Sequence, residues 1–495
     1  MQTTFTAPSN HDASRNYRIL WRWHFYAGLF VMPFLMVLAI TGSIYVFKPQ
    51  IDTALYGDKL FVASSQQTRL GYDRQLAIAA SAVPKEATAT SISVSSNPHR
   101  STETVFRLAS GDSTSVYVNP YTGQILGTLS VQHRLMQQVR QIHRDLMLGK
   151  WGGWLMELAA CWTLIMVGTG VALWWPHKAA SVWGSLLPRA GLRGRALWRE
   201  LHMVIGFWVA IGAVFFVLSG LPWSSFWGTN FQALVTWGNF DTTTNKPAEA
   251  AKTDHVHDAA SSAKADAAMP TAMPMKMQDL PLAEIPWAVG ATTVPQSNLT
   301  HVSHVSHLSP LSSHDSALPP QRLTIDQVAT IAASKGMLTY QLALPSKTAS
   351  VFTASYAPGA AEFLRSDLDQ QRTLHIDQYS GSILKDMRFA DYGVVSKAVT
   401  LGVALHMGEY FGLANQLICA GIALTLLGMA ITGFVMWWKR RPQKALGAPK
   451  RVLQPPASIK RWKGYMALMG ILFPLMGASM IVVWLGDALF FRNKA

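Results

Sequence analysis

The chain alternates between long apolar stretches and polar segments, and this pattern predicts a membrane protein. Five apolar runs are each long enough to cross a bilayer as a helix, which takes about 20 residues. They lie at about residues 24–46, 151–175, 201–222, 411–438 and 465–490. We therefore expect five transmembrane helices. The first run lacks a cleavage signal, so we expect it to be retained as an anchor.

Basic residues predict how these helices are oriented. Lys and Arg gather in segments 1–23, 176–200 and 439–464, which together carry 17 basic and two acidic residues. These segments account for the whole net charge of +15. Short loops rich in Lys and Arg face the cytoplasm. The basic excess therefore indicates how the chain is oriented in a lipid bilayer. It does not indicate binding of a nucleic acid. It predicts a cytoplasmic N-terminus and, after five crossings, a C-terminus on the outer side.

Composition agrees with this interpretation. Hydrophobic residues make up 49% of the chain and charged residues only 14%, whereas soluble domains carry about a quarter charged residues. The two cysteines, Cys161 and Cys419, lie inside apolar runs, which excludes a disulfide framework or a Cys-x-x-Cys metal site.

The chain also contains an internal repeat. A shift of 178 residues places His24 on His202, and a shift of 263 residues places His143 on His406. The first apolar run then matches the third, and the second matches the fourth. The unit is therefore a span, an outer domain and a span, used twice in the same direction, with the fifth run unpaired.

The outer segments 47–150 and 223–410 are predicted to contain two small α+β domains. Residues 116–126 match residues 374–384 after a shift of 258, and each has a turn sequence between β-prone residues. Each is expected to form a hairpin, and Thr324 is expected to cap a helix over 324–335.

Residues 241–320 lack periodicity and are expected to form a disordered linker. Its His and Met residues suit soft or borderline metals, and a polar tract without a ligand role is the alternative. These residues are His255, His257, His301, His304, His307, His314, Met269, Met273, Met275 and Met277.

Four histidines recur in register with the repeat and are the candidate metal ligands. His24 and His202 begin spans that start on the cytoplasmic side, whereas His143 and His406 precede spans that start on the outer side. Neutral imidazole is a common axial ligand of haem iron. The first span from His24 to Tyr45 covers about 32 Å of helix, so the two pairs are expected to hold two separate haems.

Nearby residues are candidates for supporting roles. Gly28 and Gly206 are expected to leave space for a macrocycle beside the first pair. Basic side chains are candidates for contact with haem propionates, or for solvated interfacial charges: Arg22 on the cytoplasmic side, and Arg140, Arg144 and Lys48 on the outer side. Glu157 and Glu409 are candidates for proton relay or substrate contact, and Glu409 alternatively for a helix N-terminal acid.

Four segments around these histidines resemble the PepSY-associated transmembrane helix family: 21–28, 142–149, 200–206 and 405–412. The two predicted hairpins resemble the family's PepSY modules. The resemblance implies an iron-regulated protein of the bacterial inner membrane, like relatives that are haem-containing ferric-siderophore reductases. It further implies b-type haems held by these histidines. Some relatives carry a fused flavin reductase domain, whereas here a separate cytoplasmic flavoprotein or a quinol is the expected electron donor.

The leading hypothesis is therefore an oxidoreductase with haem b, in which a mainly α membrane domain of five helices carries two PepSY-like periplasmic α+β domains. It would pass electrons to a ferric siderophore or another metal chelate at the periplasmic side, with no catalytic nucleophile or base. Two alternatives are a metal-chelate permease without redox chemistry and a PepSY-based regulatory or protease-inhibitory membrane protein.

Overall fold

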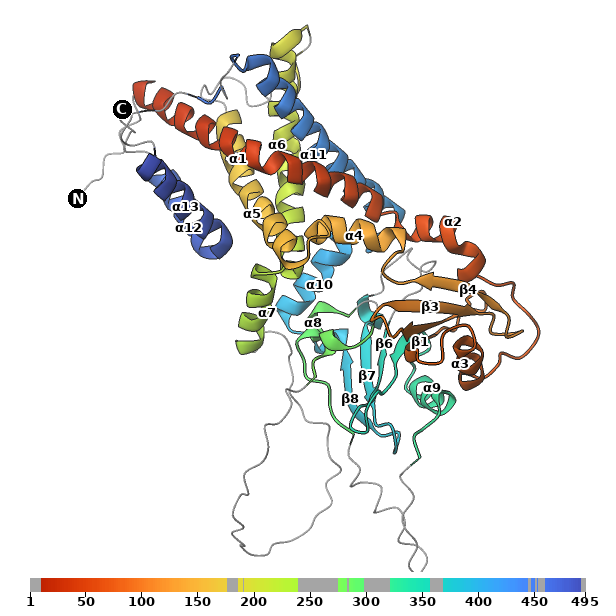
Figure 1. Ribbon diagram of the computed structural model, residues 1–495. Coiled ribbons are helices and arrows are strands. Elements are labelled where there is room, and N and C mark those ends of the chain that lie inside the picture. Colours follow the sequence, from red (N-terminus) through yellow and green to blue (C-terminus); the bar gives the residue numbers. More distant parts are fainter. Residues whose placement is uncertain are drawn as a thin grey trace, which may run out of the picture. The chain divides into compact units, whose positions relative to one another are not determined.

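The chain folds as two units, each assembled from segments of both repeats. Residues 1–48, 135–232 and 402–495 form a helical unit, and residues 49–134 and 233–401 form a sheet unit. The computed structural model (Figure 1) describes residues 10–175, 186–189, 191–238, 275–282, 285–297, 321–356, 368–443, 447–449, 452 and 459–490.

Four helices of the helical unit are long and apolar enough to cross a membrane: α1 (Asn10–Tyr45), α5 (Gly149–Trp174), α6 (Gly194–Gly220) and α11 (Leu413–Arg440). They coincide with the first four predicted spans. Helix α1 packs against α5 and α11, and α6 packs against the same two helices. Val31 and Leu35 of α1 are buried against Val209 and Ala213 of α6 and Leu426 of α11. Apolar side chains on the outer faces stay exposed, as expected of helices in lipid.

The predicted fifth span is wrong. The segment forms two shorter helices, α12 (Ile459–Leu472) and α13 (Pro474–Phe490), that contact each other. Pro474 cannot continue the preceding helix because it lacks a backbone N–H. Gly470 and Gly477 then meet so closely that a Cβ on Gly477 would lie 2.4 Å from the Gly470 carbonyl oxygen. The chain therefore turns back on itself between α12 and α13. The predicted outer position of the C-terminus depended on a fifth crossing, so it no longer follows.

Shorter helices connect these spans to the sheet unit: α2 (Lys48–Leu60), α4 (Leu135–Asp145), α7 (Trp227–Trp237) and α10 (Val394–His406). Helices α4 and α10 precede α5 and α11 at matching positions of the repeat. Gly149 and Gly412 stand where these turns end and the spans begin, with φ values of 58° and 59°. Glycine adopts such positive φ values at little cost, which explains the break at both places.

The sheet unit is built on one antiparallel sheet of eight strands in the order β4-β3-β2-β1-β5-β6-β7-β8. The first repeat supplies β1 (Thr88–Val94), β2 (Thr102–Arg107), β3 (Ser113–Val118) and β4 (Ile125–Ser130). The second supplies β5 (Tyr340–Ala343), β6 (Phe352–Ser355), β7 (Arg372–Ile376) and β8 (Ile383–Arg388). The sequence predicts two separate small domains, whereas β1 pairs with β5 and joins the two halves. This pairing covers a backbone edge that each half alone would expose.

Both predicted hairpins are confirmed, as β3–β4 and β7–β8. The Asn119 side-chain oxygen accepts a hydrogen bond from the Tyr121 amide at 2.9 Å, and Asp377 does the same for Tyr379 at 2.9 Å. Asx turns of this kind are what the Asn, Asp and Gly content of the two segments indicates.

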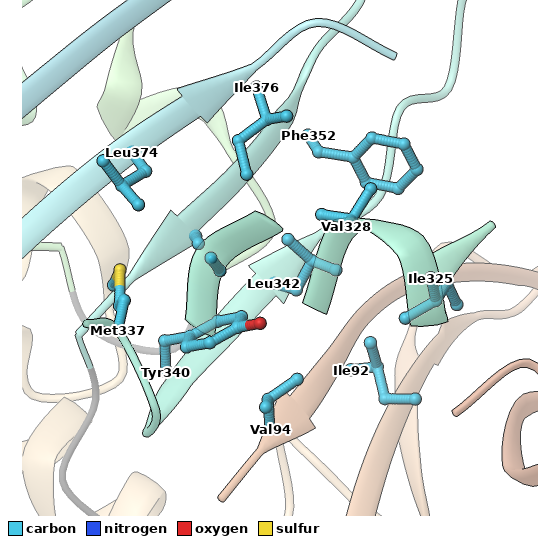
Figure 2. Close-up of a cluster of buried hydrophobic side chains, with 12 residues drawn as sticks. Ile92, Val94, Ile325, Val328, Met337, Tyr340, Leu342, Phe352, Leu374 and Ile376 are labelled. Carbon is cyan, nitrogen blue, oxygen red and sulfur yellow. The ribbon is translucent and has the colours of Figure 1, made fainter. Parts of the chain in front are cut away.

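A buried apolar cluster on one face of the sheet spans both repeats (Figure 2). Ile92 and Val94 of β1 meet Tyr340 and Leu342 of β5 under helix α9 (Ile325–Ser334). Thr324 caps α9 as predicted, by accepting a hydrogen bond from the Gln327 amide. Helix α3 (Tyr72–Ala80) is the first-repeat counterpart of α9. This cluster is therefore common to both halves, and a smaller cluster around Phe106 and Val116 belongs to the first repeat alone.

Part of the predicted linker is ordered and belongs to this unit. Residues 275–282 and 285–297 contain the 3-10 helix η3 (Met277–Asp279) and the short helix α8 (Trp287–Gly290). Met277 is fully buried and packs in one cluster with Val289 and Met387, so it is a core residue and no metal ligand. The linker's six histidines, Met269 and Met273 lie outside the described residues. Three further 3-10 helices are η2 (Leu221–Trp223), η5 (Leu368–Gln370) and η6 (Phe389–Asp391).

Two aspartates tie the helices of the two repeats together. The Asp73 carboxylate accepts hydrogen bonds from the Ile325 and Asp326 amides, both at 3.0 Å. The Asp326 carboxylate accepts in return from the Tyr72 and Asp73 amides at 2.6 and 3.3 Å. Each aspartate thus caps the N-terminus of the other repeat's helix, where carboxylates are favourable.

We expect Asp73→Ala and Asp326→Ala each to lower the free energy of unfolding by about 0.5–2 kcal/mol, because each leaves two helix amides without an acceptor. Asp73→Asn is the matched control, since it retains one acceptor oxygen and should lose less. Thermal unfolding of the purified protein in detergent measures the difference. Equal midpoints for Asp73→Ala and wild type would show that the caps contribute nothing to stability.

Candidate functional site

The four predicted histidines gather in the helical unit as two pairs. The imidazoles of His24 on α1 and His202 on α6 have centroids 6.3 Å apart and planes at 84° to each other. His143 on α4 and His406 on α10 form the second pair, outside the four spans. Burial lowers the pKa of His143 to about 4. Burial, followed by the nearby His143, lowers the pKa of His406 to about 3. Both rings are therefore neutral at pH 7, the form that binds metals.

Each imidazole is held through Nδ1 by a hydroxyl group on a neighbouring helix. The four pairs and their distances are His24 with Thr169 at 3.2 Å, His202 with Thr432 at 2.9 Å, His143 with Thr41 at 2.8 Å and His406 with Ser219 at 2.9 Å. Nδ1 of His24 also lies 3.0 Å from the Met166 carbonyl oxygen. In the part of the chain that the structure describes, no hydrogen bond engages Nε2 of any of these four rings. All four rings therefore present the same nitrogen for a further bond.

The residue after each hydroxyl is a glycine that lies against the same imidazole. A Cβ added to the glycine would meet the ring's Cε1 atom at 3.1 Å for Gly170 with His24, 3.5 Å for Gly433 with His202, 3.5 Å for Gly42 with His143 and 3.4 Å for Gly220 with His406. We call each Ser/Thr–Gly pair a cradle. The hydroxyl binds the ring edge and the glycine lies against it, most tightly at Gly170, where a Cβ would crowd the ring.

The sequence alone does not identify the cradle residues as contacts of the rings, and it points to Gly28 and Gly206 instead. The predicted free space at Gly28 and Gly206 holds methionine side chains, with Met166 Sδ 3.9 Å from a Cβ on Gly28 and Met429 Cε 2.8 Å from one on Gly206. A signal for the cradles is nevertheless in the sequence. Shifts of 178 and 263 residues place Gly42 on Gly220 and Gly170 on Gly433, each directly after a Ser or Thr.

The spacing of the first pair fits two ligands on one metal ion. Two imidazoles that bind from opposite sides through bonds of about 2.0–2.1 Å have ring centres roughly 6–6.5 Å apart, and His24 and His202 are 6.3 Å apart. Within the described residues no third His, Cys, Asp or Glu joins either pair to complete a protein-only metal site. Two opposed imidazoles are the donor set of a haem, in which the macrocycle supplies the other four nitrogens.

Basic side chains accompany the first pair. Arg22, which the sequence singles out, donates a hydrogen bond to the Pro449 carbonyl oxygen at 2.9 Å. Arg440, which it does not, lies over the rings of Trp21 and Phe25 at 4.6 and 5.4 Å. Both guanidinium groups are thus held beside the helical turn of α1 that carries His24.

The three predicted cations of the second pair lie in the segments that flank it. Arg140 is half-buried on α4, three residues before His143. Arg144 is exposed and forms an ion pair with Asp145 at 3.5 Å. Lys48 is the first residue of α2, just after the end of α1 that carries Thr41.

The structure gives Glu157 a structural role. Its buried carboxylate accepts hydrogen bonds from the Phe226 amide at 2.8 Å and the Trp227 amide at 3.0 Å, at the start of α7. These hydrogen bonds anchor α7 to α5. They account for a buried carboxylate at this position, so no proton relay is needed to explain it. Glu409 lies in the turn between α10 and α11.

Comparison with protein families agrees with the sequence and the fold. The family model of the PepSY-associated TM region matches residues 21–440. The chain belongs to this family. The match covers the four apolar helices, all four histidines and every cradle, and it confirms the resemblance found in the sequence. No curated protein matches the chain. Together with the four apolar helices, membership of the family identifies a membrane protein.

Replacing Glu157 should separate its structural role from a proton relay. We expect Glu157→Ala to destabilise the protein by about 1–3 kcal/mol, because it leaves buried backbone amides unpaired. Glu157→Gln keeps one acceptor oxygen and cannot carry a proton, so it should stay closer to wild type. Thermal unfolding in detergent compares the three proteins. Equal stability of Glu157→Ala and wild type would contradict the anchoring role.

Proposed function

We propose that this family member is a haem-containing oxidoreductase of the bacterial inner membrane, which passes electrons from the cytoplasmic side to a periplasmic ferric siderophore or other metal chelate. The main support is the neighbouring pair His24 and His202, with centroids 6.3 Å apart and both Nδ1 atoms engaged. The pair His143 and His406 has the same hydroxyl contacts. A duplicated chain that holds two such pairs is suited to two cofactors.

In this proposal, Nε2 of His24 and His202 would bind one haem b, and Nε2 of His143 and His406 a second. A bound haem supplies reversible one-electron chemistry. Arg22 and Arg440 would neutralise propionates at the first site, and Arg140, Arg144 and Lys48 would do so at the second. The Ser/Thr partners would orient the ligating rings, as residues behind metal ligands commonly do.

The basic segments support the direction of transfer. Short segments rich in Lys and Arg favour the cytoplasmic side, so residues 1–23, 176–200 and 439–464 would lie in the cytoplasm. The His24–His202 pair would then lie towards the cytoplasmic side and the His143–His406 pair towards the periplasm. Because α12 and α13 turn back on themselves, four crossings would leave both chain ends in the cytoplasm. We infer that the electron donor, a reduced flavoprotein or a quinol, acts on that side.

The reaction balances in single electrons. Oxidation of one quinol to a quinone releases two electrons and two protons, and each ferric chelate takes up one electron to become ferrous. Two chelates are therefore reduced for each quinol. The softer ferrous ion binds hard oxygen ligands less tightly, so reduction would free the iron from the chelate.

Haem content of the purified protein is the first test. We expect a b-type absorption spectrum and about two haems per chain by the pyridine haemochrome method, since each pair would supply two imidazoles to hold one haem. His24→Ala and His143→Ala should each lose one haem, and the double variant both. His99→Ala removes an exposed histidine of the sheet unit and should keep the wild-type content.

Activity is tested on the same preparation. The dithionite-reduced protein, freed of reductant, should be reoxidised by a ferric hydroxamate chelate with one ferrous ion formed per electron. A colourless protein from haem-replete cells would reject the proposal. Uptake of intact chelate into vesicles without any donor would instead indicate a permease, and a stoichiometric protease partner would indicate a regulatory protein.

A further inference from the structure

We propose that Thr41, Thr169, Ser219 and Thr432 are positioning residues that hold each of the four histidines in one tautomer, with the proton on Nδ1 and the lone pair of Nε2 available to a metal. This inference rests on the proposed function for its metal, although the tautomer can be measured without one. It assigns a separate task to the hydroxyl and to the glycine of each cradle.

The proton of each cradle hydroxyl is used in a hydrogen bond within its own helix. Every one of the four hydroxyls donates to a carbonyl oxygen one turn earlier in its own helix. The bonds run from Thr41 to Val37 at 2.6 Å, Thr169 to Ile165 at 2.7 Å, Ser219 to Phe215 at 2.6 Å and Thr432 to Met429 at 3.0 Å. A hydroxyl has a single proton. With that proton committed to the helix, the oxygen can only accept a hydrogen bond from the imidazole.

The hydroxyl oxygen also determines which nitrogen of the imidazole carries the proton. Since Thr or Ser accepts, Nδ1 must donate and therefore carries the ring proton. A neutral imidazole has one protonated nitrogen, so Nε2 is left with a free lone pair. His24 supports this assignment independently, because its Nδ1 also lies 3.0 Å from the Met166 carbonyl oxygen, which can only accept.

The glycine makes the contact possible. A Cβ at Gly170 would come within 3.1 Å of Cε1 of His24, a separation tighter than ordinary van der Waals contact. A side chain there would push the ring away from Thr169. The hydroxyl therefore sets the tautomer of each ring, and at His24 the following glycine also sets how closely the ring approaches the helix.

The arrangement has a consequence for a bound metal. Hydrogen bonding from Nδ1–H makes Nε2 a more basic ligand and fixes the orientation of the ring. Loss of such a partner typically lowers metal affinity about 10–100-fold. The cradle hydroxyls should therefore strengthen haem retention and favour the ferric state.

The experiment compares Thr169→Val and Thr432→Val, which remove the hydroxyl but keep the side-chain shape, with Thr169→Ser and Thr432→Ser, which retain it. In the haem-loaded protein we expect the Val variants to release haem about 10–100-fold faster to an acceptor apoprotein. We also expect a higher midpoint potential. The Ser variants should behave as wild type. Thr41→Val with Thr41→Ser tests the second pair in the same way.

Nitrogen-15 NMR of imidazole-labelled protein without haem reads the tautomer directly. We expect protonated Nδ1 and unprotonated Nε2 for the cradle histidines of wild type and of the Ser variants, and loss of this preference for the affected ring in the Val variants. Folded Val variants with wild-type haem release, potential and tautomer would overturn the proposal, as would a wild-type signal from protonated Nε2. A wild-type protein that binds no haem would instead reject the proposed function, while NMR would still decide the tautomer.

Discussion

The helical unit depends on one interaction, the hydrogen bond between a histidine Nδ1 and a hydroxyl on a neighbouring helix. Inside an apolar bundle, the Nδ1–H of an imidazole needs a hydrogen-bond acceptor, since an unpaired polar group there is costly. Four such bonds connect α1 to α5, α4 to α1, α6 to α11 and α10 to α6. They join each long helix to the elements that follow it in its own repeat. Ring orientation and helix packing are therefore determined together.

In the sheet unit, the two repeats are joined in a different way. There, each repeat supplies four strands and an equivalent helix, α3 or α9, and each half alone would expose the edge of β1 or β5. Pairing of β1 with β5 removes this edge, and the cluster around Ile92 and Leu342 buries residues of both halves together. Asp73 and Asp326 add a polar link between equivalent helix ends. The repeats are thus joined by paired histidines in one unit and by a shared sheet and a shared apolar cluster in the other.

The sequence predicts whatever depends on local pattern. Of the five spans that hydropathy predicts, four correspond to long apolar helices. The turn residues near Asn119 and Asp377 predict both hairpins, and the repeat singles out all four histidines. Features that depend on distant pairing are not predicted. The fold-back at Pro474 has the hydropathy of a span, and nothing local shows that β1 pairs with β5. Met277 lies in a low-complexity segment, yet it is buried because residues far along the chain cover it. The cradle glycines lie in the repeat alignment, but only the structure shows which ring each one touches.

The repeat keeps the arrangement of the histidines but varies the groups around each one. The two members of the first pair share their cradle residues, but His24 has the Met166 carbonyl as an additional acceptor at hydrogen-bonding distance. In the second pair, Thr41 in the first repeat is replaced by Ser219 in the second. The first pair lies on long helices, whereas the second lies on α4 and α10, which end shortly before glycines with positive φ. The residues behind the histidines and the helices that carry them can therefore differ between two pairs of common origin while the histidines themselves stay in register.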